Sequence, residues 1–200
     1  MPIEKNVDFP VRTVRKVPKQ ERSKRLVNTI LQAAARVLEE SKSPFTTNHI
    51  AERAGVSIGS LYQYFPNSDA IMAALIEDHV AEELRVVGGI IMAKSKPNED
   101  ILYDLLIAYV QIHSKSPCLT ARLHSQASAY GLQEYLEKAR DAQASRIAQA
   151  LGFSVSAMQM SVMAVEGVVL STLFRQAEEL ESSVFLNRLY AIALAPLNIE

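Results

Sequence analysis

Apolar residues recur at intervals of three and four positions along most of the chain, a periodicity that predicts α-helices. The first periodic segment covers about residues 20–41, and Pro44 prevents its continuation. Later segments predict helices at about 47–54, 58–65, 68–87, 98–114, 117 onward, 132–151, 156–177 and 184–197. Gly88 and Gly89, followed by the segment from Lys94 to Asn98, are expected to weaken or end the fourth helix. The pattern therefore predicts an all-α fold of about nine helices.

The segment at residues 46–65 predicts two short helices joined by a tight turn. Thr46 or Thr47 can cap the first helix, because its hydroxyl accepts a hydrogen bond from a free backbone N–H. Gly55 can take the left-handed conformation that ends this helix, and Ser57 can cap the next one. The inward positions of the second helix are Leu61 and Phe65, and the outward positions are Ile58, Gly59, Ser60, Gln63 and Tyr64. Such a pair is typical of a helix-turn-helix, whose second helix enters the DNA major groove.

The run IAERAGVSIGSLYQYF at residues 50–65, followed by a new helix at 67–71, resembles the DNA-binding region of the TetR family of bacterial repressors. The segment GSLYQYF, near the start of a helical chain of 200 residues, makes this resemblance specific. The close match covers about residues 22–76. Beyond it, only the length and the helical pattern agree.

The resemblance implies a sequence-specific transcriptional repressor that a small-molecule effector releases from a near-palindromic operator. It divides the chain from residue 19 onward into a three-helix DNA-binding domain at 19–67 and a helical effector-binding and dimerisation domain at 68–200. Residues 1–18 contain Pro2, Pro10 and Pro18 and no apolar period, which predicts a flexible basic arm. Such an arm could contact the minor groove or the DNA backbone, or it could be a solvated leader that contacts nothing. One position departs from the family, which usually has a lysine where Ser68 stands. A phosphate contact is therefore absent there, and the basic arm could compensate for it.

Candidate DNA contacts follow from the resemblance together with the outward positions. Candidate base contacts are Asn48, Ile58, Gly59, Ser60 and Gln63. Of these, Gln63 can pair through two hydrogen bonds with adenine. Candidate phosphate contacts, through hydroxyls and helix N-termini, are Thr47, Ser57, Tyr62 and Tyr64.

Polar residues within the otherwise apolar rear helices are candidate ligand contacts, because a buried polar group needs a hydrogen-bond partner. They are Tyr103, Tyr109, His113, Arg122, His124, Gln126, Tyr130 and Glu166. Met163 is a further candidate, although the methionines at 158, 160 and 163 have a simpler interpretation as adaptable core or dimer-interface residues. Each polar candidate also has a simpler interpretation as a core or rim residue that its neighbours satisfy. Glu166 is the sharpest candidate, although Arg122 or Arg175 could pair with it instead.

Charge is unevenly distributed along the chain, and this supports DNA binding by its N-terminal part, residues 1–68. Residues 1–68 hold 11 Lys and Arg against 6 Asp and Glu, and residues 69–200 hold 10 against 16, so net charges of +5 and −6 give the overall −1. A basic front suits contact with phosphate. Residues 1–25 are polar and basic, and no run reaches about 18 uninterrupted apolar residues. We expect a cytoplasmic protein without a membrane segment.

The last two predicted helices, 156–177 and 184–197, are apolar on nearly every side. A helix that is apolar all round must be covered all round, and in a chain this small a partner subunit is the expected cover. The resemblance implies the same arrangement, a homodimer in which these two helices form a four-helix bundle with their copies.

Two other functions compete with this interpretation. His113, Cys118 and His124 lie within twelve residues and suggest Cys–His catalysis, but no supporting acid, glycine-rich turn or oxyanion loop accompanies them. We therefore expect no enzyme, no cofactor and no metal site. The second alternative keeps the DNA-binding front and makes the rear domain a docking module for a protein partner, with no small effector. Activation in place of repression is also open.

Overall fold

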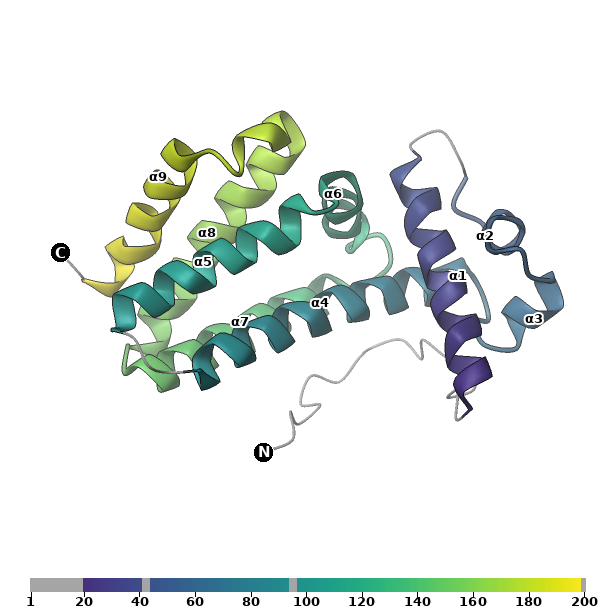
Figure 1. Ribbon diagram of the computed structural model, residues 1–200, viewed down its shortest axis with the longest axis horizontal. Coiled ribbons are helices and arrows are strands. Elements are labelled where there is room, and N and C mark those ends of the chain that lie inside the picture. The colour runs from purple at the N-terminus through teal and green to yellow at the C-terminus, as the bar shows by residue number, and fades with distance from the viewer. Residues whose placement is uncertain (1–19, 41–43, 94–96, 199–200) are drawn as a thin grey trace. The chain divides into compact units, whose positions relative to one another are not determined.

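The structure is a computed structural model that describes residues 20–40, 44–93 and 97–198. Over these ranges the chain forms nine α-helices, two short 3₁₀ helices and no β-strand, so the all-α prediction is confirmed (Figure 1). The helices are α1 (Glu21–Glu39), α2 (Thr47–Ala54), α3 (Ile58–Tyr62), α4 (Ser68–Met92), α5 (Asn98–Ser114), α6 (Pro117–Gln126), α7 (Gln133–Leu151), α8 (Val155–Gln176), η1 (Ala177–Glu179), α9 (Ser183–Leu194) and η2 (Ala195–Leu197). The predicted arm at 1–18 lies outside the described residues.

The described residues pack as two compact units. The first unit holds the described residues up to His79 together with Arg122–Tyr135, and the second holds Val80–Ala121 and the residues from Leu136 onward. Helices α4, α6 and α7 each contribute residues to both units. These packing units divide the chain at other positions than the predicted boundary between residues 67 and 68. The functional division at that boundary stays a prediction.

Fully buried side chains from α1 to α4 form the core of the first unit. They are Ile30, Leu38, Ile50, Leu61, Phe65, Ile71, Met72 and Ile76. Helix α2 packs directly against both α1 and α3. Burying one side chain of this kind contributes roughly 1.5–3 kcal/mol. This core therefore fixes α3 through Leu61 and leaves its opposite face in solvent.

The helix ends in the first unit follow the predicted capping residues. Thr46 Oγ1 accepts a hydrogen bond from the His49 N–H at 3.3 Å, and Ser57 Oγ accepts one from the Ser60 N–H at 3.1 Å. Gly55 ends α2 with a positive φ of 66°. The turn between α2 and α3 was therefore predictable, because each of these residue types has a local reason to stand where it does.

The fourth helix extends beyond its predicted end near residue 87, because Gly88 and Gly89 do not end it. Helix α4 continues through both glycines to Met92, and neither has a positive φ. A glycine within a helix costs about 1 kcal/mol relative to alanine. Packing offsets this cost, since Val87 is buried in the core of the second unit and Ile90 and Ile91 pack against it.

Two groups of buried apolar side chains form the core of the second unit. The first group, which includes Leu102, Ile147 and Met158, joins α4, α5, α7, α8 and η2. The second group joins α5, α8 and α9. The start of α5 is tied to the end of α7, since Asn98 Nδ2 donates a hydrogen bond to the Leu151 carbonyl at 2.8 Å. The predicted starts and ends at Asn98 and Gly152 are confirmed.

Candidate functional site

The outward face of α3 is the candidate DNA-binding surface of the first unit. Leu61 and Phe65 are fully buried, as predicted, so the opposite side of the helix is left to solvent. The exposed side chains are Asn48, Ser57, Ile58, Tyr62 and Gln63, with Gly59 exposed among them and Thr47 and Ser60 half-buried. Among the larger side chains of this face, Ile58 and Tyr62 are 37 % and 40 % exposed.

Side-chain hydrogen bonds hold the hydroxyl groups of this face in place. Thr47 Oγ1 and the Tyr62 hydroxyl lie 3.1 Å apart, which links α2 to α3. Ser57 Oγ and Ser60 Oγ lie 2.8 Å apart. A hydroxyl can donate and accept at once, so each of these groups keeps hydrogen-bonding capacity for a further partner such as a phosphate oxygen.

The expectation that Tyr64 faces outward is wrong, because its side chain is only 6 % exposed. The Tyr64 N–H bonds to the Leu61 carbonyl at 3.0 Å, three residues back. This tighter turn rotates each residue by about 120° rather than 100°. Tyr64 therefore turns onto the core side with Phe65, and it offers little surface to a phosphate.

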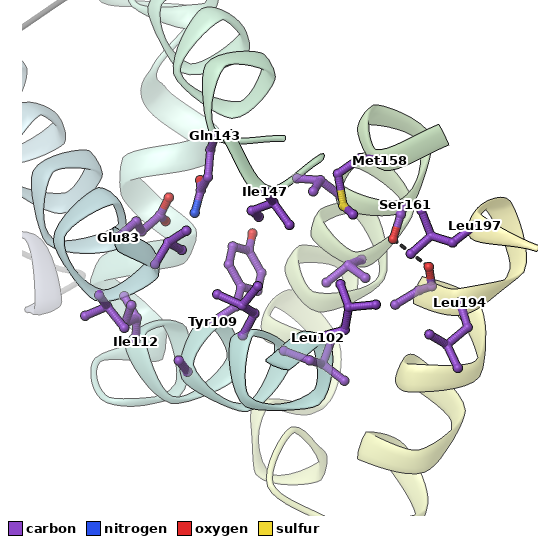
Figure 2. Close-up of a pocket in the computed structure, with 18 residues that line it drawn as sticks. Glu83, Leu102, Tyr109, Ile112, Gln143, Ile147, Met158, Ser161, Leu194 and Leu197 are labelled. Atoms are coloured by element: carbon purple, nitrogen blue, oxygen red, sulfur yellow. Dashed lines mark hydrogen bonds between the residues drawn. The ribbon is translucent and has the colours of Figure 1, made fainter. Parts of the chain in front are cut away.

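A pocket lies within the second unit, among α4, α5, α7, α8, α9 and η2 (Figure 2). The cavity has a volume of about 70 Å³, several times the ~10–15 Å³ that a single water needs. Its lining is mostly aliphatic, with four polar residues, Glu83, Tyr109, Gln143 and Ser161. An apolar cavity with few polar groups is typical of small-molecule sites.

The polar groups of the pocket are concentrated at one side. Figure 2 shows Glu83 and Gln143 at one side and Met158, Leu194 and Leu197 at the other. The Gln143 side chain is 7 % exposed and lines the pocket.

Two pairs of charged or ionisable groups surround this polar side. His113 Nε2 lies 3.3 Å from Glu83 Oε1, and His113 Nδ1 lies 2.8 Å from the Tyr109 carbonyl oxygen. Because a carbonyl only accepts hydrogen bonds, Nδ1 carries a proton. Arg140 Nη1 donates to Glu166 Oε2 at 3.1 Å.

Burial and neighbouring carboxylates shift the protonation of this region. Burial raises the pKa of the Glu166 carboxyl, and the Glu83 carboxylate adds to the rise, whereas the hydrogen bond from Arg140 opposes it. Burial also raises the pKa of the Tyr109 phenol well above its usual value, with further contributions from Glu83 and Glu166. Tyr109 is therefore a neutral hydroxyl at physiological pH.

Of the ligand-contact residues expected from the sequence, Tyr109 lines the pocket. His113 and Glu166 contact its surroundings, and Glu166 pairs with Arg140 rather than with Arg122 or Arg175. Tyr103 is 37 % exposed and meets Tyr190 edge to face, while Met163 is 56 % exposed on α8. The remaining candidates, Arg122, His124, Gln126 and Tyr130, belong to the first unit.

Sequence reasoning missed Glu83 and Gln143, although a signal was present for both. Glu83 falls at helical spacing between the buried Val80 and Val87 on α4. Gln143 stands four residues before the buried Ile147 on α7. A polar residue within an apolar helical stripe indicates a buried polar group, and the same test could have found these two.

One segment of the chain matches a family model, and solved structures share its fold. Residues 30–75 match the family model described as bacterial regulatory proteins, tetR family. A putative TetR-family transcriptional regulator from Mesorhizobium loti has a similar structure, with a TM-score of 0.68 and 16 % identity over 89 % of this chain and 98 % of that one. The comparison with curated proteins finds no match.

Two further similar structures contain ligands. One is FadR from Bacillus subtilis in complex with stearoyl-CoA, with a TM-score of 0.58 and 16 % identity over 86 % of this chain and 99 % of that one. The other is a variant of TetR from Acinetobacter baumannii in complex with minocycline, with a TM-score of 0.59 and 19 % identity over 92 % of this chain and 100 % of that one. At these identities the likeness concerns the fold.

Proposed function

We propose that this chain is a member of the tetR family of bacterial regulatory proteins, which the match at residues 30–75 and the fold support, and that it is a repressor that an effector releases from its operator. Members of this family are DNA-binding transcription factors and not enzymes. The sequence specificity, the near-palindromic operator, the repressing sign and the release by a small molecule are further parts of this proposal.

One observation carries the DNA-binding part, namely the outward face of α3. Ile58, Tyr62 and Gln63 are exposed there beside Gly59, while Leu61 anchors the helix to the core. Polar and apolar side chains at the start of a recognition helix can contact base edges, and the absence of a side chain at Gly59 permits close approach. We assign Asn48, Ile58, Gly59, Ser60 and Gln63 to bases and Thr47, Ser57 and Tyr62 to phosphates.

An uncharged stripe on α8 supports a homodimer. Its exposed residues follow helical spacing and are Ser156, Met160, Met163, Gly167, Ser171 and Phe174. On α9, Val184 and Ile192 are also exposed. A second copy of the chain would remove this apolar surface from water, and the two-fold symmetry would match a near-palindromic operator with half-sites about 34–36 Å apart. The proposed interface comprises residues 156–177 and 184–197.

The segment Val155–Glu179 is also long and apolar enough to cross a membrane by length and composition alone. That is weak evidence, because helices of soluble proteins pass the same test. A dimer interface accounts for the exposed apolar side chains without a membrane. We propose a cytoplasmic location, since the operator DNA lies there.

The pocket of the second unit supports a small-molecule effector. FadR and the TetR variant hold stearoyl-CoA and minocycline, respectively, on the same fold. An effector releases DNA when it binds the non-DNA-binding state more tightly, and the ratio of the two affinities sets the extent of release. No observation on the described residues favours a protein partner in this role over a small molecule.

Selection of bound fragments from a genomic DNA library, at a stated salt concentration of about 150 mM, tests the proposed function. Recovery of one near-palindrome upstream of a gene is the expected result. The neighbouring genes then provide candidate effectors, whose addition should release the fragment. Salt-sensitive recovery of all sequences alike, or no recovery at all, would contradict sequence-specific repression.

A further inference from the structure

We infer that the effector is an uncharged molecule with an apolar body and one neutral polar head, a hydroxyl or a carbonyl group. The inference rests on the proposed function of the pocket as the effector site, and it names the chemical class of the ligand. Amines and carboxylic acids carry a charge near pH 7 and are therefore excluded as preferred ligands.

The first support is the apolar side of the pocket. Ser161 is the polar lining residue there, and its hydroxyl donates a hydrogen bond to the Ala193 carbonyl at 2.6 Å. The lining residues beside it are apolar, and Figure 2 labels three of them, Met158, Leu194 and Leu197. This side of the pocket therefore suits the hydrocarbon part of a ligand.

The second support is the pairing of the lining carboxylate. Among the described lining residues, Glu83 is the one that can carry a charge at neutral pH, and its Oε1 lies 3.3 Å from Nε2 of the fully buried His113. The His113 Nδ1 already carries a proton, since it lies 2.8 Å from the Tyr109 carbonyl oxygen. Lone pairs on both Nε2 and Oε1 would repel each other, which favours a proton between them. With that proton the Glu83–His113 pair has no net charge.

The nearby ionic pair is matched in the same way. Arg140 Nη1 donates to Glu166 Oε2 at 3.1 Å, and neither residue is among the described lining residues. An ammonium or a carboxylate head in the pocket would therefore lose its water without gaining an opposite charge. A neutral head does not have this cost.

The third support is a pair of uncharged polar groups that can bind such a head. The Tyr109 hydroxyl and the Gln143 amide both belong to lining residues, and in Figure 2 both point toward the middle of the lining side chains. Burial raises the pKa of the Tyr109 phenol well above its usual value, so the hydroxyl keeps its proton. A phenol and an amide can each donate and accept a hydrogen bond, which suits a hydroxyl or a carbonyl group.

Three molecules with the same eight-carbon body separate the possible heads, namely 1-octanol, octylamine and octanoate. Isothermal titration calorimetry on the full-length chain near pH 7 should show 1-octanol binding at least about tenfold more tightly than either ion. Because the three molecules share one body, the ratio of their affinities reports on the head alone.

Two matched variants assign the head to the pocket. Tyr109→Phe keeps the ring and removes the hydroxyl, and it should weaken 1-octanol binding by about threefold or more. Tyr103→Phe removes the same group from α5 at a residue outside the described lining, and it should leave 1-octanol binding unchanged. The ranking of the three molecules on the unmodified protein does not depend on whether either variant folds.

Equal or tighter binding of octylamine or octanoate would overturn the inference, and so would equal effects of the two variants. Failure of all three molecules to bind at millimolar concentration would also overturn it. Binding of the operator fragment, measured on the same protein samples, keeps this result separate from the proposed function. Operator binding with release by a charged effector would refute the neutral head and retain the repressor, whereas tight 1-octanol binding without operator binding would refute the repressor.

Discussion

On the outward face of α3, two adjacent residues differ in what they can contribute to DNA binding. Tyr62 holds its hydroxyl 3.1 Å from Thr47, a position suited to a phosphate, whereas the exposed Gln63 amide can donate and accept toward one base edge. A phosphate contact adds affinity to every sequence. A base contact adds affinity to one sequence and so adds discrimination.

We predict that Gln63→Ala relaxes discrimination at particular base pairs by about 1–3 kcal/mol. Tyr62→Phe should instead weaken binding by about the same factor for every DNA sequence. The measurement is operator affinity across a panel of single base-pair substitutions at fixed salt. Uniform losses over the whole panel for both variants would contradict the assignment of Gln63 to a base.

Glu166 gives a prediction about pH, because burial raises its pKa in the folded state above the unfolded value of about 4.5. The folded state then holds the proton more tightly, so the free energy of unfolding falls as pH rises from about 4.5 through the folded-state pKa. The decrease is at most about 1.4 kcal/mol per pH unit within that window. Above it, the loss is complete and constant.

Glu166→Gln should remove this part of the pH dependence, since the amide oxygen still accepts from Arg140 but does not titrate. Urea unfolding of both proteins between pH 4 and 8 measures it. The free-energy difference between variant and unmodified protein should move in the variant's favour as pH rises through the window. Glu178→Gln, at an exposed site, is the control, and identical profiles for all three proteins would refute the effect.

Among the elements, helix ends were predictable where one residue type has a local role. The side chains of Thr46 and Ser57 accept hydrogen bonds from backbone N–H groups at the starts of α2 and α3, and Gly55 ends α2 in the left-handed conformation, as predicted. The same reasoning placed the end of the fourth helix too early, at Gly88 and Gly89, because tertiary packing of their neighbours outweighs helix propensity. It also predicted an outward-facing Tyr64 side chain, which is wrong because the last turn of α3 tightens, and periodicity alone does not reveal this.

The two kinds of glycine predict opposite responses to the same substitution. An added Cβ meets no atom within 4 Å at Gly89 or at Gly55, so backbone conformation alone distinguishes the two sites. Gly89→Ala should stabilise the protein by roughly 0.5–1 kcal/mol, because alanine loses less entropy in a helix. Gly55→Ala, at a φ of 66°, should destabilise it by about 1–2 kcal/mol.

Urea denaturation at one temperature measures both glycine variants against the unmodified chain. Opposite signs are expected. A loss of stability for Gly89→Ala would mean that α4 does not continue as a regular helix past this point in solution.

At the scale of the whole molecule, the apolar character predicted for the last two helices accounts for an exposed apolar surface in addition to buried residues. Helix α8 buries Met158, Val165 and Val169 inside the chain and leaves Met160, Met163 and Phe174 in solvent. Sequence indicated that both sides need a cover. It did not indicate the pocket, whose lining residues come from helices far apart in sequence and meet only through tertiary packing.

We predict that Met163→Glu weakens the proposed homodimer about a hundredfold or more, because two symmetry-related carboxylates would be buried without partners. Met92→Glu is the matched control, since it introduces the same residue at an even more exposed methionine at the end of α4. Sedimentation velocity over a range of concentrations measures the dissociation. A monomeric unmodified protein, or equal dissociation of both variants, would exclude this interface.

The different spread of the two candidate sites along the gene has a consequence for evolution and engineering. The proposed DNA contacts lie between Thr47 and Gln63, whereas the pocket lining extends from Glu83 to Leu197. A short exchanged segment can therefore carry a new operator preference into this chain as a unit. A new effector preference requires coordinated changes in several distant codons, so the two specificities should diversify at different rates.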